Sequence, residues 1–200
     1  MTFRMLDSID VAHLPDGADA YAGYVAGRWP TWAALKQRFD GKAHLVSIAI
    51  AADEHALCLD IETGDAQPWQ APGWVQAEHG RNVARPVLYA SVSRMAAVVG
   101  YLHRHGIALA SVRLLSAHYG QGKHICGPDT CKQIAEPMDG TQWTDAAAGV
   151  GGAKVDESLL AADFFAPPPP PPAEVTYAAV RLKDGVTRLV VSTDGGKTLH

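Results

Sequence analysis

The sequence of 200 residues lacks the features that direct a protein to nucleic acid or into a membrane. Its formal net charge is −4 and it contains no run of basic residues, so binding to nucleic acid has no support. No apolar stretch reaches the ~18 residues of a membrane span, so no membrane insertion is expected. The N-terminus, MTFRMLDSID, lacks a charged segment followed by a long apolar one, and no signal peptide is visible.

Cysteine is also scarce, with three in the chain. Cys58 lies in an apolar stretch and is expected to be a small buried side chain. Cys126 and Cys131 lie in HICGPDTC, a loop rich in Gly, Pro and Asp, where a local disulfide is the favoured interpretation. The alternatives are two free thiols, or a zinc site that adds His118 or His124, which is disfavoured because no second Cys/His pair stands at ligand spacing. A disulfide would indicate exposure to an oxidising compartment.

The distribution of proline divides the chain. Apolar residues make up 48% of the sequence, as in a globular protein, but six consecutive prolines follow residue 166 and favour a stiff polyproline II spacer. The predicted parts are a barrel body of residues 1–165, a polyproline linker of residues 166–173 and a tail of residues 174–200. The tail alternates apolar and polar residues on both sides of an Asp-Gly pair, which predicts a β-hairpin.

Within the body, apolar runs alternate with helical patterns. The predicted strands are residues 3–7, 20–25, 44–51, 56–62, 85–91, 111–119, 138–145 and 154–160. The predicted helices are residues 31–39, 73–82 and 93–106. Strands that alternate with helices indicate a parallel sheet, and eight of them indicate closure into a barrel. The fold class is therefore α/β, a (β/α)8-type TIM barrel with some helices short or missing, plus a small C-terminal β-hairpin.

Acidic, amide and aromatic side chains gather near the ends of the predicted strands. In such a barrel the active site lies at these ends. Asp60 and Glu62 alternate with apolar neighbours at the end of the fourth strand, so both lie on one face. The other polar or aromatic residues near strand ends are Asp7, Tyr89, His118, Tyr119, Gln142, Trp143 and Asp156. A ring of acids and aromatics is typical of a sugar site, because aromatic rings stack on sugars and acids supply protons.

Five segments in order resemble the family 25 glycoside hydrolases, the Chalaropsis-type lysozymes. They are LDIETGD, RPVLYAS, LLSAHY, DGTQWTD and KVDESLL. The family also has an acid on its first strand, which either Asp7 in RMLDS or Asp10 in SIDVAH could supply; Asp7 is favoured because it follows an apolar strand. The chain departs from the family in a shorter region before the fourth strand, in HLVSIAIA as third strand, and in Leu114-Leu115 where tryptophan is usual. It looks like a divergent, shortened member or a glycoside-hydrolase-like relative.

The resemblance implies cleavage of the β-1,4 bond between N-acetylmuramic acid and N-acetylglucosamine in peptidoglycan, as by a phage endolysin or an actinobacterial wall enzyme. It implies Glu62 as general acid and Asp60 as the supporting carboxylate, or as the group that orients a substrate N-acetyl. The implied substrate-binding residues are Asp7, Tyr89, His118, Tyr119, Gln142, Trp143 and Asp156. No cofactor and no metal ion are expected.

A second hypothesis is a non-catalytic glycan-binding barrel that serves as a virion or cell-surface structural protein. With no visible signal peptide, the chain is expected to be made in the cytoplasm and to act at the cell wall, or to be part of a virion. A metabolic barrel enzyme is disfavoured, because the only glycine-rich candidate for a phosphate-binding loop, GVGGAK, directly precedes the last strand. The oligomeric state stays open.

Overall fold

The computed structural model describes residues 1–167, 176–181 and 187–192. The chain divides into two compact units, Met1–Pro168 and Pro169–His200, and each is described by itself. None of the helices in the described part of the chain is both long and apolar enough to cross a membrane.

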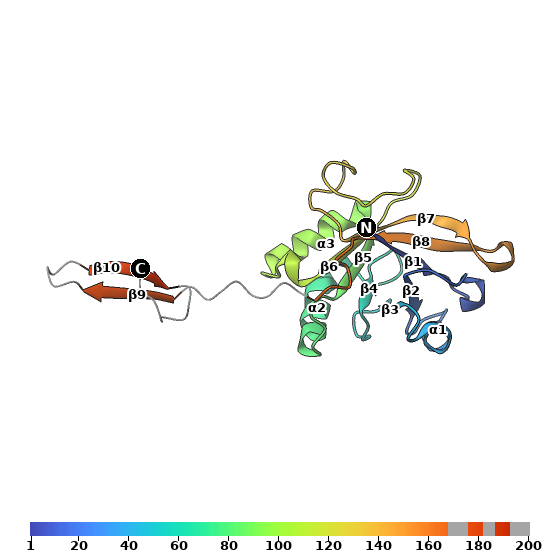
Figure 1. The fold of residues 1–200 in the computed structure, drawn as a ribbon, viewed down its shortest axis with the longest axis horizontal. Coiled ribbons are helices and arrows are strands. Elements are labelled where there is room, and N and C mark those ends of the chain that lie inside the picture. The colour runs from blue at the N-terminus through green and yellow to red at the C-terminus, as the bar shows by residue number, and fades with distance from the viewer. Residues whose placement is uncertain (168–175, 182–186, 193–200) are drawn as a thin grey trace. The chain divides into compact units, whose positions relative to one another are not determined.

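The first unit is a closed barrel in which eight strands follow one another in chain order (Figure 1). The strands are β1 (Phe3–Asp7), β2 (Ala20–Tyr24), β3 (His44–Ala49), β4 (Cys58–Asp60), β5 (Val87–Ser91), β6 (Arg113–Ala117), β7 (Gly140–Ala148) and β8 (Lys154–Leu160). The α-helices are α1 (Trp32–Phe39), α2 (Ala71–Gly80) and α3 (Val92–Arg104). Short 3-10 helices are η1 (Val11–His13), η2 (Pro68–Gln70), η3 (Leu109–Ser111) and η4 (Val150–Gly152). The predicted α/β barrel with helices missing is confirmed.

The eighth strand runs against the other seven. Neighbouring strands from β1 to β7 pair in parallel, whereas β8 pairs antiparallel with both β7 and β1. A short turn around η4 joins β7 to β8, and such a turn can connect antiparallel strands only. The beginning of β8 therefore lies at the carboxyl ends of the parallel strands. The predicted all-parallel sheet is wrong in this one strand.

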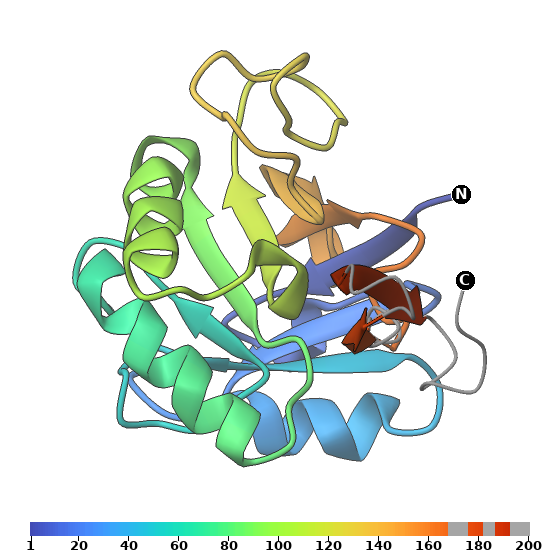
Figure 2. The ribbon, with the colours of Figure 1, turned by 90° about the vertical axis from the view of Figure 1, so that its left-hand side faces the viewer.

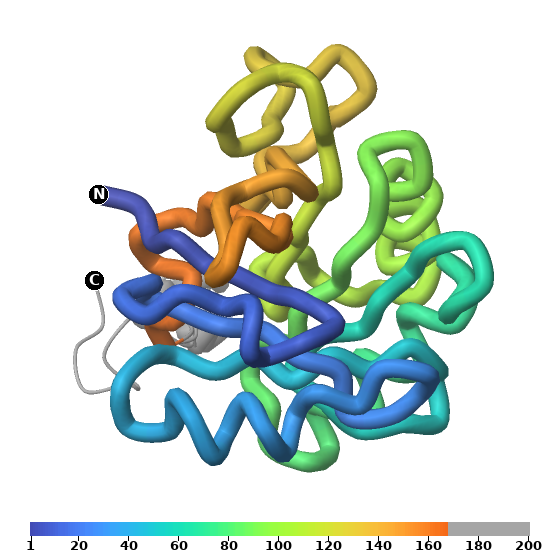
Figure 3. The backbone as a smooth tube through the Cα atoms, turned by 90° about the vertical axis from the view of Figure 1, so that its right-hand side faces the viewer, coloured from blue at the N-terminus to red at the C-terminus, as the bar shows by residue number. Residues whose placement is uncertain are grey.

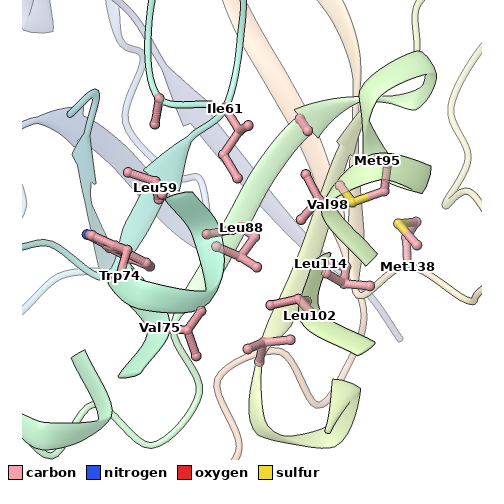
Figure 4. Close-up of a cluster of buried hydrophobic side chains, with 14 of the residues drawn as sticks. Leu59, Ile61, Trp74, Val75, Leu88, Met95, Val98, Leu102, Leu114 and Met138 are labelled. Atoms are coloured by element: carbon pink, nitrogen blue, oxygen red, sulfur yellow. The ribbon is translucent and has the colours of Figure 1, made fainter. Parts of the chain in front are cut away.

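Apolar side chains outside the barrel hold the helices against the strands (Figure 4). Leu59 and Ile61 point outward from the β4 segment, and Trp74 of α2 is fully buried nearby. In α3, Met95, Val98 and Leu102 recur at helical spacing and face the sheet. Figure 2 shows α1, α2 and α3 on the outside of the barrel, whereas no α-helix of residues 1–167 covers β7 and β8.

A second apolar cluster fills the barrel interior below the acids. It consists of Met5, Ala20, Ala22, Val46, Ile48, Cys58, Val87, Leu115, Leu160 and Phe164. At the beginning of β6, the fully buried Arg113 forms ion pairs with Asp139 at 2.6 Å and with Asp163 at 3.1 Å. These charges lie at the amino ends of the parallel strands, the end of a barrel that serves stability.

The longest connection without a helix in the first unit is the loop of residues 118–139 between β6 and β7. Figure 3 shows it, yellow to gold, rising away from one side of the barrel. Ile134 and Met138 anchor its second half in the same cluster as α3. The loop thus begins at the carboxyl end of β6 and returns to the barrel through apolar contacts.

The second unit is described only as a two-stranded sheet. Strands β9 (Thr176–Arg181) and β10 (Thr187–Ser192) pair antiparallel, with Thr187 opposite Arg181. Antiparallel pairing is what the alternation on both sides of the Asp-Gly pair predicts. The Asp-Gly pair itself and the prolines after Pro167 lie outside the described residues.

Candidate active site

A pocket opens at the carboxyl ends of the parallel strands, inside the barrel. Its polar lining residues are Asp7, Tyr24, Asp60, Glu62, Tyr89, Tyr119, Gln142 and Asp156. Apolar residues of the interior cluster, together with Cys58, form the rest of the lining. Four carboxyl groups from β1, the β4 segment and β8 therefore meet in one pocket, and its lining contains no lysine or arginine.

The local sequence of the fourth strand explains how two of these acids enter the pocket. Side chains alternate across a strand, so Cys58, Asp60 and Glu62 point inward while their neighbours pack against the helices. The strand ends at Asp60, and Glu62 follows in the segment that leads into a turn. Gly64 makes this turn with a φ of 105°, which side chains other than glycine rarely adopt. Glu62 therefore lies at the mouth of the pocket and Asp60 deeper inside.

The first and last strands of the barrel bring the other two acids together. Asp7 ends β1 and Asp156 is near the beginning of β8, and the antiparallel register places them directly opposite each other. Burial, the charge of Asp156 and a hydrogen bond with Asp156 raise the pKa of Asp7 well above its usual value. Burial also raises the pKa of Asp156, although hydrogen bonding to Asp7 and Gln142 opposes the rise. Each of these two adjacent acids therefore favours its protonated form more than an isolated aspartate does.

Asp60 is the acid with the most clearly displaced titration. Burial, followed by the charges of Glu62 and Asp65, raises its pKa from 3.8 to about 8. The side chain is 4% exposed, the Tyr24 hydroxyl donates to Oδ2 over 3.5 Å, and Oδ1 has no partner. A buried carboxyl with so few donors is more stable protonated. Asp60 is therefore neutral at pH 7 in the free protein.

Glu62 titrates under opposing influences. Partial burial and the charge of Asp65 raise its pKa, whereas hydrogen bonding from Tyr89 and the positive charge of Arg94 lower it. Arg94 is held in place by Thr63 at 3.2 Å and by Gln67 at 2.9 Å. Glu62 thus has an elevated pKa and remains accessible to solvent, which a group that exchanges protons with a ligand requires.

Tyrosine hydroxyls line the wall between the two groups of acids. Gln142 Nε2 donates to the Tyr119 hydroxyl over 2.9 Å, and Tyr119 is 46% exposed. Burial raises the pKa of Tyr119 to about 12 and raises that of Tyr89 above its usual range, so both keep their protons. Burial likewise raises the pKa of the Tyr24 hydroxyl and of the Cys58 thiol. The pocket therefore offers neutral hydroxyl donors and carboxyl groups.

The structure brings most of the predicted site residues together but leaves two outside. Trp143 does not line the pocket; its Nε1 donates to Glu157 over 3.2 Å on the outer face of β7. His118 does not line it either, because its ring turns toward Cys126 and Cys131. Adjacent side chains face opposite ways along an extended chain. Gln142, which precedes Trp143, and Tyr119, which follows His118, are therefore the residues that line the pocket.

Two further observations refine the predicted set. Asp10 is exposed and caps η1, accepting from the Ala12 N–H over 2.9 Å, so Asp7 is the first-strand acid in the pocket. Tyr24 was missed by the sequence analysis although it ends β2 and contacts Asp60. The rule that polar side chains at strand ends form the site would have found it.

Cys126 and Cys131 lie outside the pocket, in the loop of residues 118–139. They are paired as a disulfide with Cα atoms 5.4 Å apart, whereas Cys58 is free and buried. Among the described residues, His118, His124, Cys126 and Cys131 form the one group of His, Cys, Asp or Glu side chains whose donor atoms could hold a metal ion. No comparable group occurs in the acidic pocket of the described chain.

Comparisons with known proteins support the fold but do not show a family. No protein-family model matches the sequence, and no curated protein matches it. Among solved structures, the chain is similar to a bacterial lysozyme from Streptomyces coelicolor, with a TM-score of 0.54 and 14% identity over 81% of this chain and 94% of that chain. Identity this low shows a shared fold. The chain thus has a lysozyme-like α/β barrel, with an acidic pocket at the carboxyl ends of its strands.

Proposed function

We propose that the barrel is a glycoside hydrolase that cleaves the β-1,4 bond between N-acetylmuramic acid and N-acetylglucosamine in peptidoglycan. The observation that carries this proposal is the meeting of four carboxyl groups in one pocket whose lining has no lysine or arginine. Such a pocket favours the positive charge that develops on a sugar ring as its glycosidic bond breaks. The choice of peptidoglycan rests on the five ordered segments and on the lysozyme-like fold.

Glu62 is the proton donor in this proposal. It lies at the mouth of the pocket, and partial burial raises its pKa, which favours the protonated form that a proton donor requires. Its proton passes to the glycosidic oxygen as the bond from that oxygen to the anomeric carbon breaks. Water then adds to the sugar and returns a proton to Glu62, which balances the reaction.

Asp60 supports the charged sugar from deeper in the pocket. It is neutral in the free protein, with a pKa of about 8, and a developing positive charge beside it favours its ionised form. The same position would also let Asp60 orient an N-acetyl group of the substrate. The proposal includes both roles for Asp60, stabilisation of charge and orientation of this group. Asp7 and Asp156 hold the adjoining wall of the pocket and contact sugar hydroxyls.

A second hollow extends the proposed glycan site. It is lined by Ile9, Tyr24, Ala26, Arg28, Trp29, Ile50 and Asp65. Tyr24 lines both the pocket and this hollow, so the two adjoin at that side chain. Trp29 is 45% exposed, and an exposed indole is well suited to stack on a sugar ring. A chain of several sugars would thus occupy both.

One observation favours a non-catalytic glycan-binding barrel as the second candidate. A supporting carboxylate has to be ionised, yet Asp60 is neutral at pH 7 in the free protein. If Asp60 keeps this proton when substrate binds, the pocket binds glycan through neutral hydrogen-bond donors without cleaving it. The two candidates differ in whether new reducing ends form.

Clearing of a cell-wall suspension tests the proposal. The wild-type chain is expected to lower turbidity and release reducing ends, and Glu62→Gln to slow both by at least about 100-fold, since a general acid contributes roughly 10²–10⁴-fold. Glu136→Gln is the matched control, because Glu136 lies outside the pocket and should leave the rate unchanged. Absence of clearing and of reducing ends on several wall types would contradict hydrolysis. Glycan pull-down that persists in Glu62→Gln would then identify the binding barrel.

A further inference from the structure

Four potential metal ligands converge in the loop of residues 118–139, outside the pocket. His118 Nδ1 lies 3.1 Å from His124 Nε2, 3.3 Å from Cys126 Sγ and 3.2 Å from Cys131 Sγ. Cys126 Sγ lies 3.4 Å from His124 Nε2. All four donor atoms are within 4.8 Å of one another. Each side chain thus directs one donor atom at a common centre.

The donor set and its dimensions match one metal. Two thiolates and two imidazoles are a typical tetrahedral set for zinc. Zinc bonds of ~2.0 Å to nitrogen and ~2.3 Å to sulfur give edges of roughly 3.3–3.8 Å between ligands of a tetrahedron. The four distances from nitrogen, 3.1 to 3.4 Å, are at or slightly below this range. Small outward movements of the histidines would accommodate an ion, once reduction of the disulfide lets the two sulfurs separate.

The surroundings of the four side chains are those of a structural site. His124 Nδ1 donates to the Gly122 carbonyl over 2.7 Å, which leaves the lone pair of Nε2 directed at the centre. Metal-binding histidines are oriented by such a second hydrogen bond. Cys126 and Cys131 are 2% and 3% exposed, and the Cys126 N–H donates to Thr141 Oγ1 over 2.8 Å. The thiols therefore sit in a fixed, largely dry position.

We propose that the chain with both cysteines reduced binds one zinc ion through His118, His124, Cys126 and Cys131. Zinc enters as Zn²⁺ and displaces the two thiol protons, while both imidazoles bind as neutral ligands. The disulfide that joins the same two sulfurs is the two-electron oxidised form, and a dithiol or a phosphine converts it to the two thiols. The disulfide and the zinc site are thus alternative states of one loop, selected by the redox environment.

The site lies next to the wall of the pocket. Tyr119 follows His118 directly and receives the hydrogen bond from Gln142 in the pocket. Lys123, next to His124, contacts Glu157 at 2.9 Å on β8. A metal that ties the start of the loop to its middle therefore restrains both contacts. Metal binding itself does not depend on the proposed hydrolysis, so each can fail alone.

The thiol content of the full chain, produced in a reducing cytosol, is the first test. The zinc-bound form should show three reactive thiols after unfolding in chelator, because all three cysteines are reduced. A disulfide would leave one, Cys58. One thiol in freshly isolated protein, together with no zinc uptake after reduction by a phosphine, would overturn the proposal and leave a disulfide beside a hydrogen-bonded histidine pair.

Metal binding is measured on the reduced, chelator-treated chain. Zinc should bind at one ion per chain, and Co²⁺ in its place should give the intense visible bands of tetrahedral cobalt with thiolate charge-transfer absorption. His118→Ala and His124→Ala should each weaken zinc binding by at least about 100-fold, because one of four ligands is lost. His105→Ala, at an exposed histidine outside the loop, is the matched control. Octahedral cobalt spectra, or unchanged affinity in both variants, would contradict the site.

Limited proteolysis reports on the loop without any substitution. Trypsin should cut after the exposed Lys123 and Lys132 several-fold faster in the reduced, metal-free chain than with zinc bound. Equal cleavage with and without zinc would show that no ion fastens the loop.

Discussion

Asp7 and Asp156 lie opposite each other across the junction of β1 and β8 and share a hydrogen bond. The junction closes the barrel, so the contact that completes the sheet also pairs two acids, the buried Asp7 and the half-buried Asp156. Burial raises the pKa of both, and the charge of Asp156 raises that of Asp7 further. Closure of the barrel therefore places two interacting carboxyl groups in the same pocket as the acid that we propose donates a proton.

Replacement of Asp60 should stabilise the protein at alkaline pH. Its folded-state pKa of about 8 exceeds the usual 3.8, so the stability linked to its protonated form is complete below about pH 4 and is lost as pH rises through 8. Asp60→Asn puts an uncharged side chain of the same shape as the protonated aspartate in its place. The free energy of unfolding in urea should rise by at least about 1.4 kcal/mol at pH 9, the equivalent of one pKa unit. An equal gain at pH 4 would show that the ionisation of Asp60 is not the cause.

The alkaline limb of the pH–rate profile should move in opposite directions in two variants. Asp65 raises the pKa of Glu62 and Arg94 lowers it. If Glu62 must be protonated to act, Asp65→Asn should move the limb to lower pH and Arg94→Gln to higher pH, each by a few tenths of a pH unit or more. Wall clearing from pH 4 to 9 measures both. Shifts in the same direction would argue against Glu62 as the proton donor.

Trp29 should contribute to substrate binding more than to the chemical step. Its ring lines the hollow that adjoins the pocket. Trp29→Ala should raise KM several-fold with kcat nearly unchanged, since it removes apolar contact with a bound sugar and leaves the groups at the reacting bond in place. Trp69→Ala is the control, because Trp69 is 61% exposed and lines neither cavity. Equal effects of the two substitutions would exclude the hollow as a sugar site.

Stability should depend on Arg113 at the other end of the barrel. The side chain is 1% exposed and its pair with Asp139 is 2.6 Å long. Arg113→Met should lower the free energy of unfolding by about 1.5–3 kcal/mol, because Asp139 and Asp163 lose a charged hydrogen-bond donor. Arg38→Met, which removes a partly exposed arginine paired with the exposed Asp16, should cost less than about 1 kcal/mol. Thermal and urea unfolding compare them, and similar losses would contradict a special role for Arg113.

Much of the barrel can be predicted from the sequence because each element has a strong local pattern. The apolar alternation before Asp60 and the helical spacing of Met95, Val98 and Leu102 appear directly in the observed β4 and α3. The direction of β8 cannot be read this way, since apolar periodicity is the same for a strand running either way. Asp156 nonetheless lies in the pocket, because the antiparallel direction of β8 brings the beginning of that strand, and not its end, to the same rim.

Trp143 and His118 are the two predicted binding residues that lie outside the pocket, and both were predicted together with a sequence neighbour that lines it. Adjacent side chains of an extended chain face opposite sides, so only one of each pair points into the barrel. The convergence of His118 with His124 and both cysteines depends on how the loop of residues 118–139 folds back. No periodic pattern encodes that path, so the sequence shows the four residues but not their meeting point.

The pairing of the first strand with the last also sets the order of events during synthesis. A growing chain that has reached Ala148 already contains seven strands and Asp7, Asp60 and Glu62, but it has neither a partner for the edge of β1 nor Asp156. Only when β8 has been made can the sheet close. Closure of the barrel and completion of the acidic pocket are therefore a single event. A chain that has not yet been synthesised through β8 does not contain the complete site.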